Sequence, residues 1–318
     1  MKSRGLLFLS ILLGLGLNIY SKDFLDPEFR NSIFWTLRFP STLYAFFVGG
    51  ALSLVGLNYQ YLFRNNLASP YTLGVASVSA LGASCFAVLS HFSPDLFWGL
   101  HYLISFSFCF MASIFLYFLY KKVLRGSMTH LLLSGVTLSL IASSLIVFSQ
   151  FIIGNRDGHE LMVSLMGNIS AVGYLTPGIL IVLTFFYLFS LKKNLRSLRL
   201  HSVNDEISSL LGVDKNQVVK KSLFLPTLLI SFIVADCGPI AFVGLMVPHI
   251  VKDFLKASAK DELVSIFLFG GAFMLFCQFF SRSLLPEGQV PVGIVTSLMG
   301  GLFFLYLLSS KRSSSHSL

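Results

Sequence analysis

The sequence predicts an all-α protein that crosses a membrane about ten times. Hydrophobic residues make up 55% of the 318 residues and charged residues only 12%, about half of the charged share in soluble domains. The mean hydropathy is +0.79, and long apolar runs follow one another along the whole chain. Because a helix needs about 20 apolar residues to cross a membrane, these three observations predict a polytopic helical bundle.

Ten apolar runs are interpreted as spans. The first follows Lys2 and Arg4, but no small-residue cleavage site comes after it, so we expect a retained span and not a removed signal peptide. The runs on either side of Gly238 are too short for straight spans, so one long span or a re-entrant segment is an alternative there. The ten runs are Leu6–Tyr20, Thr42–Phe63, Tyr71–Phe92, Leu100–Tyr120, Leu131–Ile153, Tyr174–Leu191, Leu223–Ala235, Ile240–Val251, Leu263–Phe280 and Pro291–Ser309.

The basic residues predict the orientation of these spans. With a cytoplasmic N-terminus and ten alternating spans, 18 of the 23 lysines and arginines fall on the cytoplasmic side. Cytoplasmic loops of membrane proteins carry such an excess. We therefore expect a multi-pass protein of the inner (cytoplasmic) membrane with both termini in the cytoplasm. The net charge of +9 is then explained without a nucleic-acid partner, because basic loops lie beside anionic lipid.

The chain is expected to form a single transmembrane domain over residues 1–310, followed by a disordered cytoplasmic tail over residues 311–318. The tail is rich in serine and carries two basic residues, a composition that is typical of disordered segments.

No motif in the sequence is typical of a catalytic, nucleotide-binding or metal site. The four cysteines, Cys85, Cys109, Cys237 and Cys277, lie in apolar runs without a paired spacing, which favours small buried side chains. His249 has no second ligand at a useful spacing, so a hydrogen-bonding role is favoured. We therefore expect no enzymatic activity, no cofactor and no metal.

One long polar segment, residues 192–221, interrupts the apolar pattern and contains a short predicted helix. An asparagine precedes the helix as its cap, two acidic residues suit its first turn, two leucines give it an apolar face, and a glycine ends it. Such a helix either lies on the lipid headgroups or docks a cytoplasmic partner. The residues concerned are Asn204, Asp205, Glu206, Leu210, Leu211 and Gly212.

Four stretches resemble, in the same order, the signature of the FecCD-type permeases, which are the transmembrane subunits of ABC importers for iron-siderophores and vitamin B12. The first contains "GALSLVGLNYQYLFRNNLASP", and the third contains "CGPIAFVGLMVPHIVK". The resemblance covers nearly the whole chain. The stretches are Leu37–Ala83, Leu131–Ile141, Cys237–Lys252 and Val290–Leu308.

The resemblance implies a fold like that of the B12-importer permease and a role as a non-catalytic permease subunit. Its implied partners are a second permease subunit (identical or paralogous), two ABC ATPase subunits in the cytoplasm and an extracytoplasmic substrate-binding protein. The expected cargo is an iron complex, a ferric siderophore, with vitamin B12 or haem as alternatives. An ion-coupled secondary transporter is an alternative of another class. It would need coupling groups near the membrane midplane. Asp236 is the one residue that hints at such a role, and its place at the predicted outer end leaves a solvated carboxylate as the alternative.

The resemblance also implies roles for single residues. Arg38 and Arg282 match arginines with which family members pair to glutamates of the binding protein, whereas Ser41 stands where the family has a second arginine. As bare residues, such arginines can also reach lipid headgroups. Ser127, Met128 and Thr129 fall where the B12 relative forms its cytoplasmic gate, and an ordinary loop is the alternative.

The remaining matched positions are expected to be structural. Gly238 and Pro239 free backbone groups at a span junction, which membrane proteins tolerate only where protein or water satisfies those groups. Gly244 allows another helix to approach closely. The full set is Gln60, Asn65, Pro70, Gly74, Gly238, Pro239, Gly244, Pro248, His249, Pro291 and Gly293.

Overall fold

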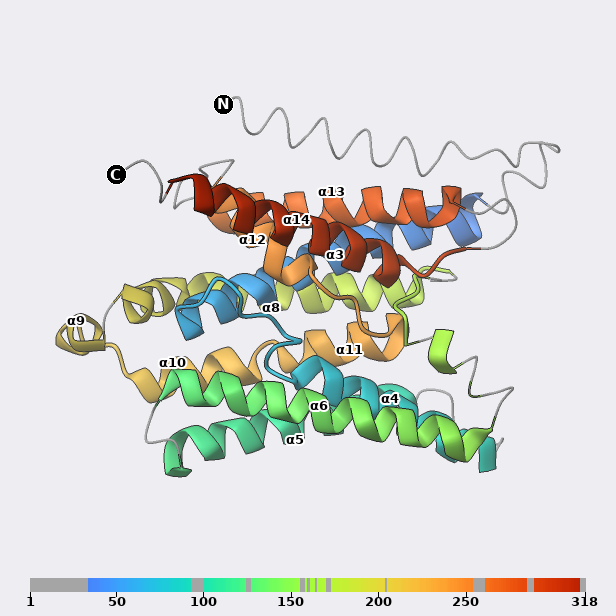
Figure 1. The fold of residues 1–318 in the computed structure, drawn as a ribbon, viewed down its shortest axis with the longest axis horizontal. Helices are drawn as coiled ribbons and strands as arrows, with labels where there is room; N and C mark the ends of the chain where they lie inside the picture. The colour runs from blue at the N-terminus through green and yellow to red at the C-terminus, as the bar shows by residue number, and fades with distance from the viewer. Residues whose placement is uncertain are drawn as a thin grey trace.

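A computed structural model describes most of the chain, and within its residues all regular structure is helical. Most helices run along the long axis of the molecule and form a layered bundle (Figure 1). The all-α prediction is therefore confirmed for this part of the chain. The described residues are 34–92, 100–123, 127–154, 158, 161–163, 165–169, 173–203, 205–253, 261–284 and 289–314.

The helices follow the predicted apolar runs closely. A short π-helix, η1 (Phe34–Arg38), leads directly into α3, and a second, η2 (Leu119–Val123), extends α5. The α-helices are α3 (Phe39–Phe63), α4 (Val75–Phe92), α5 (Leu100–Phe118), α6 (Met128–Ile153), α8 (Leu175–Val203), α9 (Asp205–Leu210), α10 (Lys215–Phe224), α11 (Thr227–Cys237), α12 (Val243–Asp253), α13 (Glu262–Ser283) and α14 (Val292–Ser314).

Seven helical stretches of the described part are long and apolar enough to cross a membrane, one of which joins α10 and α11. Helix α12 has only 11 residues, and the apolar part of α14, Val292–Leu307, is also shorter than a full span. The predicted first span, Leu6–Tyr20, lies outside the described residues. The expected count of ten spans is therefore not confirmed.

Helix α3 lies at the centre of one half of the bundle. It packs against α8, α12 and α13, and 89% of its apolar window is buried. Glycines bring the backbones together: a Cβ atom added to Gly56 would lie 1.6 Å from the Gly244 carbonyl oxygen of α12, and one on Gly49 would lie 2.2 Å from the Gly270 carbonyl oxygen of α13. Small residues are the usual means of close helix approach in membranes.

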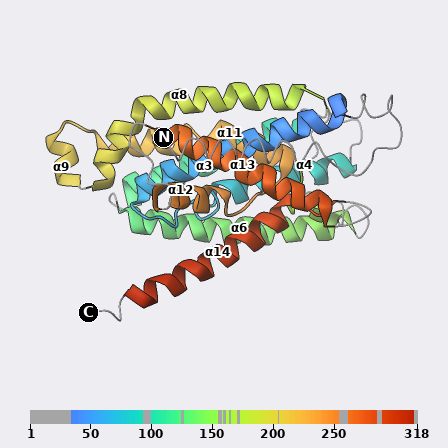
Figure 2. The same cartoon turned by 90° about the horizontal axis from the view of Figure 1, so that it is seen from above.

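The other half of the bundle consists of α4, α5, α6 and α11, which pack on one another. In Figure 1, α4, α5 and α6 form the lower layer, while α3, α12, α13 and α14 form the upper one. Figure 2 shows that α14 slants away from the other helices toward the C-terminus. Only 17% of the apolar window of α6 is buried.

The structure corrects several predicted boundaries. Helix α4 begins at Val75 and not at Tyr71, because the chain turns through residues 70–74 and Gly74 has a φ of +71°. Pro70 therefore lies in the turn and not in the first turn of α4. The polar segment 192–221 is largely helical, since α8 continues to Val203 and α10 begins at residue 215. Of the predicted tail, residues 311–314 belong to α14, and residues 315–318 lie outside the described residues.

Candidate coupling and docking sites

Two ends of the bundle carry the predicted site residues. The basic end is the end at which α9 lies, where α3, η2 and α8 end and α6, α10 and α13 begin (Figure 1). Lys121 and Lys122 of η2, Lys192 of α8 and Lys221 of α10 belong to these elements. The opposite end is where η1 leads into α3, α13 ends and α14 begins.

Helix α9 is the element that the sequence predicts over residues 204–212. It contains Asp205 and Glu206, whereas Asn204 lies outside the described residues. Leu210 is 86% exposed and Leu211, which follows the helix, is 60% exposed. Gly212 has a φ of +75°, and its N–H donates to the Ser209 carbonyl at 3.0 Å, so it closes the helix as predicted. The helix therefore presents apolar side chains outward at the basic end.

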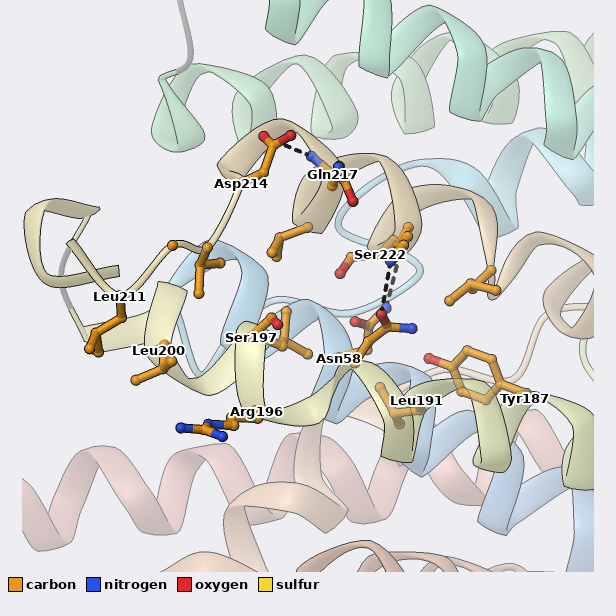
Figure 3. A pocket seen from close by; sticks show the side chains of 17 residues that line it. Asn58, Tyr187, Leu191, Arg196, Ser197, Leu200, Leu211, Asp214, Gln217 and Ser222 are labelled. Carbon is orange, nitrogen blue, oxygen red and sulfur yellow. Dashed lines mark hydrogen bonds between the residues drawn. The ribbon is translucent and has the colours of Figure 1, made fainter. Parts of the chain in front are cut away.

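A cavity of about 450 Å³ lies between α8, α10 and the end of α3, next to α9 (Figure 3). Two hydrogen bonds link helices at its wall: Asn58 donates to the Ser222 carbonyl at 2.9 Å, and Lys221 donates to Asn194 Oδ1 at 3.2 Å. Leu211 reaches the cavity from the α9 side. The neutral Asn58 side chain thus joins α3 to the backbone of α10, and the Lys221 side chain joins α10 to α8.

The segment after α9 is held at the cavity rim by the start of α10. Asp214 precedes α10, and its Oδ1 accepts the backbone N–H of Asn216 at 2.9 Å and that of Gln217 at 3.3 Å. This is a side-chain cap of the helix N-terminus, and Figure 3 shows Asp214 and Gln217 in contact. The cap fixes where the chain returns from α9 to the bundle.

At the opposite end, the structure brings Arg38 and Arg282 to one serine. Ser41 donates its hydroxyl hydrogen to the Arg38 carbonyl at 3.0 Å, and its oxygen accepts from Arg282 Nη2 at 2.7 Å. Ser41 is buried, and it is the residue that stands in place of the second family arginine. The hydroxyl therefore bridges the start of α3 and the end of α13.

The predicted gate residues begin α6. Ser127 caps the helix, and its Oγ lies 2.8 Å from Nδ1 of His130. Met128 is partly buried and packs against the hydrophobic core, whereas Thr129 is exposed. These residues lie at the basic end, on a different element from α9.

The structural positions make contacts between distant segments. Gln60 of α3 donates to the Leu245 carbonyl of α12 at 3.0 Å. Asn65 Oδ1 accepts the Leu67 N–H at 2.9 Å in the turn after α3. Gly74 packs against α6, because a Cβ there would lie 2.5 Å from the Gly135 carbonyl oxygen.

The break between α11 and α12 lies at Gly238 and Pro239, where the sequence predicts a span junction. Gly238 has a φ of +71° and ends α11, so no single helix crosses this point. Pro239 follows it, and its carbonyl faces Gly167. Pro248 and His249 lie inside α12, where His249 Nε2 is 3.2 Å from Asp253 Oδ2.

The segment before α14 packs against the chain that follows α6. Pro291 directly precedes α14, and the Gly293 N–H donates to the Gly167 carbonyl at 3.0 Å. A Cβ on Gly293 would lie 2.1 Å from the Met166 carbonyl oxygen. A glycine is therefore required by this close approach.

Asp236 lies at the end of α11, toward the opposite end of the bundle. Its Oδ1 accepts the Tyr102 hydroxyl at 2.6 Å, and it lines a second cavity of about 490 Å³ together with His101 and Asn168. Within the described residues, no group of three or more His, Cys, Asp or Glu side chains is arranged to hold a metal ion.

Comparison with known proteins identifies the family. The family model of the FecCD transport family matches residues 5–310, which is nearly the entire chain. The chain belongs to the FecCD transport family. It is a multi-pass membrane protein and a permease of this family, as its sequence motifs and apolar helices predict.

Several curated permeases are similar to this FecCD chain. The hemin transport system permease HmuU of Yersinia pestis is 29% identical over 88% of this chain and 84% of its own length. An iron chelatin transport system permease of Helicobacter pylori is 32% identical over 87% of this chain and 82% of its own length. The vitamin B12 import permease BtuC of Yersinia pseudotuberculosis is 28% identical over 86% and 81%.

Two solved structures share the fold of this FecCD chain. A chain of a metal-chelate type ABC transporter in an inward-facing conformation superposes with a TM-score of 0.83 at 26% identity, covering 96% of this chain and 97% of that one. PsaBC from Streptococcus pneumoniae gives a TM-score of 0.57 at 20% identity over 84% and 89%. The second match concerns the fold alone.

Sequence reasoning missed the residues around the cavity of this FecCD permease. Asn58, Asn194 and Lys221 line it from three helices, but their spacing in the chain gives no sign that they meet. Asn58 carried one usable signal, because an amide inside an apolar run must find a partner within the protein.

Proposed function

We propose that this chain is the permease subunit of an ATP-driven importer that moves an iron complex, a ferric siderophore, across the cytoplasmic membrane. The observation that carries the proposal is α9. A short helix that ends at the exposed Leu210 and is followed by the exposed Leu211 projects at one end of a bundle whose family transports solutes. Such a helix suits a cytoplasmic ATPase as its partner. The chain itself hydrolyses nothing in this proposal.

The proposed orientation places the basic end in the cytoplasm, together with both chain termini. The excess of lysine and arginine on the elements of this end supports it. A cysteine substituted at Leu210 should react with a membrane-impermeant maleimide only in inverted vesicles and not in intact cells. The matched control is a cysteine at Leu284, which is exposed beyond α13 at the opposite end and should react only in intact cells. Labelling of residue 210 from outside would contradict the orientation.

The ATPase partnership is tested by copurification and reconstitution. Two ABC ATPase subunits should copurify with the permease, and replacing both Leu210 and Leu211 by serine should weaken this association. Lys193→Ser, which changes another exposed residue of the same end, serves as the control. Copurification that survives the double substitution unchanged would remove α9 as the docking element.

The cargo is tested by uptake into proteoliposomes that contain the permease and its ATPase and binding-protein partners. A ferric siderophore should be taken up in preference to haemin or cobalamin, which the names of the relatives make the alternatives. Preference for haemin or cobalamin would keep the permease assignment and replace the cargo. Uptake that is driven by an ion gradient without ATPase subunits would favour a secondary transporter instead.

We propose that Arg38 and Arg282 dock the extracytoplasmic binding protein at the opposite end. The Ser41 hydroxyl binds the Arg38 backbone carbonyl and the Arg282 guanidinium, which supports a common location for the two residues. Reversing both charges to glutamate should slow association with the binding protein, most strongly at low salt, because such pairs steer encounters within a screening length of about 10 Å. Arg196→Glu at the basic end is the control. Association with unchanged rate and salt dependence would contradict the docking role.

The start of α6 is proposed as the cytoplasmic gate of the path along the axis of a permease dimer. Met128 would narrow the path with an apolar side chain, and Thr129 is exposed beside it. Replacing both by glycine should raise ATP-independent leakage of the cargo from loaded proteoliposomes. Leakage at the level of the unmodified permease would leave the segment as an ordinary helix start.

A further inference from the structure

A buried carboxylate joins three helices at the basic end. Glu262 is the first residue of α13 and is only 6% exposed. One of its oxygens, Oε2, pairs with the Arg199 guanidinium of α8. The other, Oε1, accepts the Tyr61 hydroxyl of α3 at 2.6 Å. Each oxygen of one side chain therefore binds a different helix.

Further contacts close this cluster around the end of α8. The Lys252 ammonium of α12 lies 4.1 Å from the centre of the Tyr61 ring, a cation–π contact. Arg64, which ends α3 with a left-handed backbone (φ 51°), donates from Nε to the His201 carbonyl of α8 at 2.9 Å. Two residues near the end of α8, Arg199 and His201, are thus held by α3 and α13.

Separating the members of this cluster is energetically costly, because the Glu262 carboxylate is buried. A carboxylate removed from water needs a cation and hydrogen bonds to remain charged, and Glu262 has both. Burial lowers the pKa of the Lys252 ammonium below its usual value, and the nearby Glu262 carboxylate opposes this shift only in part. Removal of Glu262 would leave the Arg199 guanidinium and the Tyr61 hydroxyl without the carboxylate that both bind.

The position of the cluster relates it to α9. Helix α8 runs unbroken from Leu175 to Val203, and α9 begins at residue 205. On the α8 side, the approach to α9 is held by an ion pair between the half-buried Arg199 and the buried Glu262. On the α10 side, the return from α9 borders the cavity, which the Asn58–Ser222 and Lys221–Asn194 hydrogen bonds cross. The two sides of α9 are therefore attached differently: an ion pair holds the α8 side, whereas a cavity with two hydrogen bonds borders the α10 side.

We propose that Glu262 is a positioning residue that clamps the end of α8 to α3 and α13, so that a displacement of α9 moves these three helices as one unit. The inference rests on the proposed function, because it takes an ATPase partner as the source of the displacement. Motion of this unit relative to α10 then occurs at the cavity between α8 and α10.

The first test measures cargo transported per ATP hydrolysed in proteoliposomes containing the permease with its ATPase and binding-protein partners. Glu262→Gln keeps the shape of the side chain and removes its charge. It should leave ATP hydrolysis in place and lower transport per ATP roughly fivefold or more, the range of typical coupling between sites. Arg199→Lys, which keeps the charge, should retain more coupling. Lys193→Met, an exposed charge removed from the same helix, should change nothing.

A ratio of transport to hydrolysis that stays unchanged in Glu262→Gln would overturn the proposal, even if both rates fall together. Tyr61→Phe provides a milder variant if the glutamine variant does not fold, because it removes one hydrogen bond and leaves the ion pair. It should lower the ratio to an intermediate value, and an unchanged ratio would count against the clamp.

A second test does not depend on the ATPase partner. Spin labels at Val203, at the end of α8, and at Phe276 of α13, both exposed, report the distance between these helices in the detergent-solubilised permease. The unmodified chain should give one narrow distance distribution, and Glu262→Gln should broaden or split it. A distribution unaffected by the substitution would refute the clamp. Failure of ATPase copurification with an intact distance effect would refute only the proposed function.

Discussion

Helices α3 and α6 are both long apolar helices, yet they occupy opposite environments. The apolar window of α3 is 89% buried and that of α6 is 17% buried. Helix α3 carries Gly49, Gly50 and Gly56 at its contacts, as well as the buried amides Asn58 and Gln60. Helix α6 instead turns large side chains such as Leu140 and Phe148 outward.

The difference teaches which sequence signal marks burial in a membrane protein. Lipid and the protein interior are similarly apolar environments for a side chain. Hydrophobicity therefore does not decide which helix lies in the interior of the bundle. Glycines and amide side chains mark the interior helix, because glycines permit contact between backbones and amides need hydrogen-bond partners within the protein. The outward face of α6 is then available to lipid or to a second permease subunit.

The strongest test of this difference between α3 and α6 replaces a glycine of α3 by alanine. A Cβ on Gly56 would lie 1.6 Å from a backbone oxygen of α12, so Gly56→Ala should abolish the monodisperse folded protein in size-exclusion chromatography. Gly301→Ala on α14, where nothing lies within 4 Å of the added atom, is the control. It should be neutral or stabilising by up to about 1 kcal/mol, the helix-propensity gain. Equal behaviour of the two variants would remove the close-packing account of α3.

The second test compares one leucine from each helix. Leu54 of α3 is 0% exposed and Leu140 of α6 is 65% exposed. Leu54→Ala should lower the free energy of unfolding by about 2–5 kcal/mol through the cavity that it leaves, whereas Leu140→Ala should change it by less than about 0.5 kcal/mol. Denaturant titration of the detergent-solubilised protein measures both. A large loss at residue 140 would show that α6 is covered even in the isolated chain.

A third test addresses a close backbone approach of α6, of the kind that is frequent on α3. A Cβ on Gly135 would lie 2.7 Å from the Leu73 Cα in the turn before α4. Gly135→Ala should therefore cost about 1–3 kcal/mol, as overpacking does, in the same titration. Gly178→Ala on α8, with nothing within 4 Å, is the matched control. If residue 135 tolerates alanine as well as residue 178 does, α6 has no tight contact with this turn.

The smallest expected effect concerns a polar residue of each helix. Asn58→Ala removes the donor to the Ser222 carbonyl at the cavity and should cost about 1–3 kcal/mol, since a buried acceptor loses its partner. Ser144→Ala on α6 removes a hydroxyl that bonds only within its own helix, to the Leu140 carbonyl, and should fall within about 0.5 kcal/mol. Similar losses at both positions would mean that polar groups of α6 also serve packing.

The helical class, the family and the apolar helices were accessible from the sequence, because runs of apolar residues and local motifs are short-range signals. The helix at residues 205–210 was also predicted, since capping and turn residues are local. The span count was not, because α12 and the apolar part of α14 are too short to be judged by length. The predicted roles of Arg38, Arg282, Met128 and Thr129 stay predictions.

The charged cluster at Glu262 was beyond sequence reasoning for a physical reason. Arg199 and Glu262 are 63 residues apart, and Arg199 falls in the polar segment 192–221 that interrupts the predicted spans. Only the continuation of α8 to Val203 carries its guanidinium back to the bundle. A glutamate that opens a helix is ordinarily explained by the helix dipole, so nothing in its local sequence distinguished a buried partner from an exposed cap.

The contact between Gly56 and Gly244 is made by backbone atoms alone. Where two side chains meet, a larger residue on one helix can be compensated by a smaller residue on the other. Such pairs of positions therefore change together during evolution. Gly56 and Gly244 have no side chains, so neither position can take a smaller residue. We expect a genetic selection for second-site revertants of a Gly56 substitution to return the glycine itself and no change at residue 244.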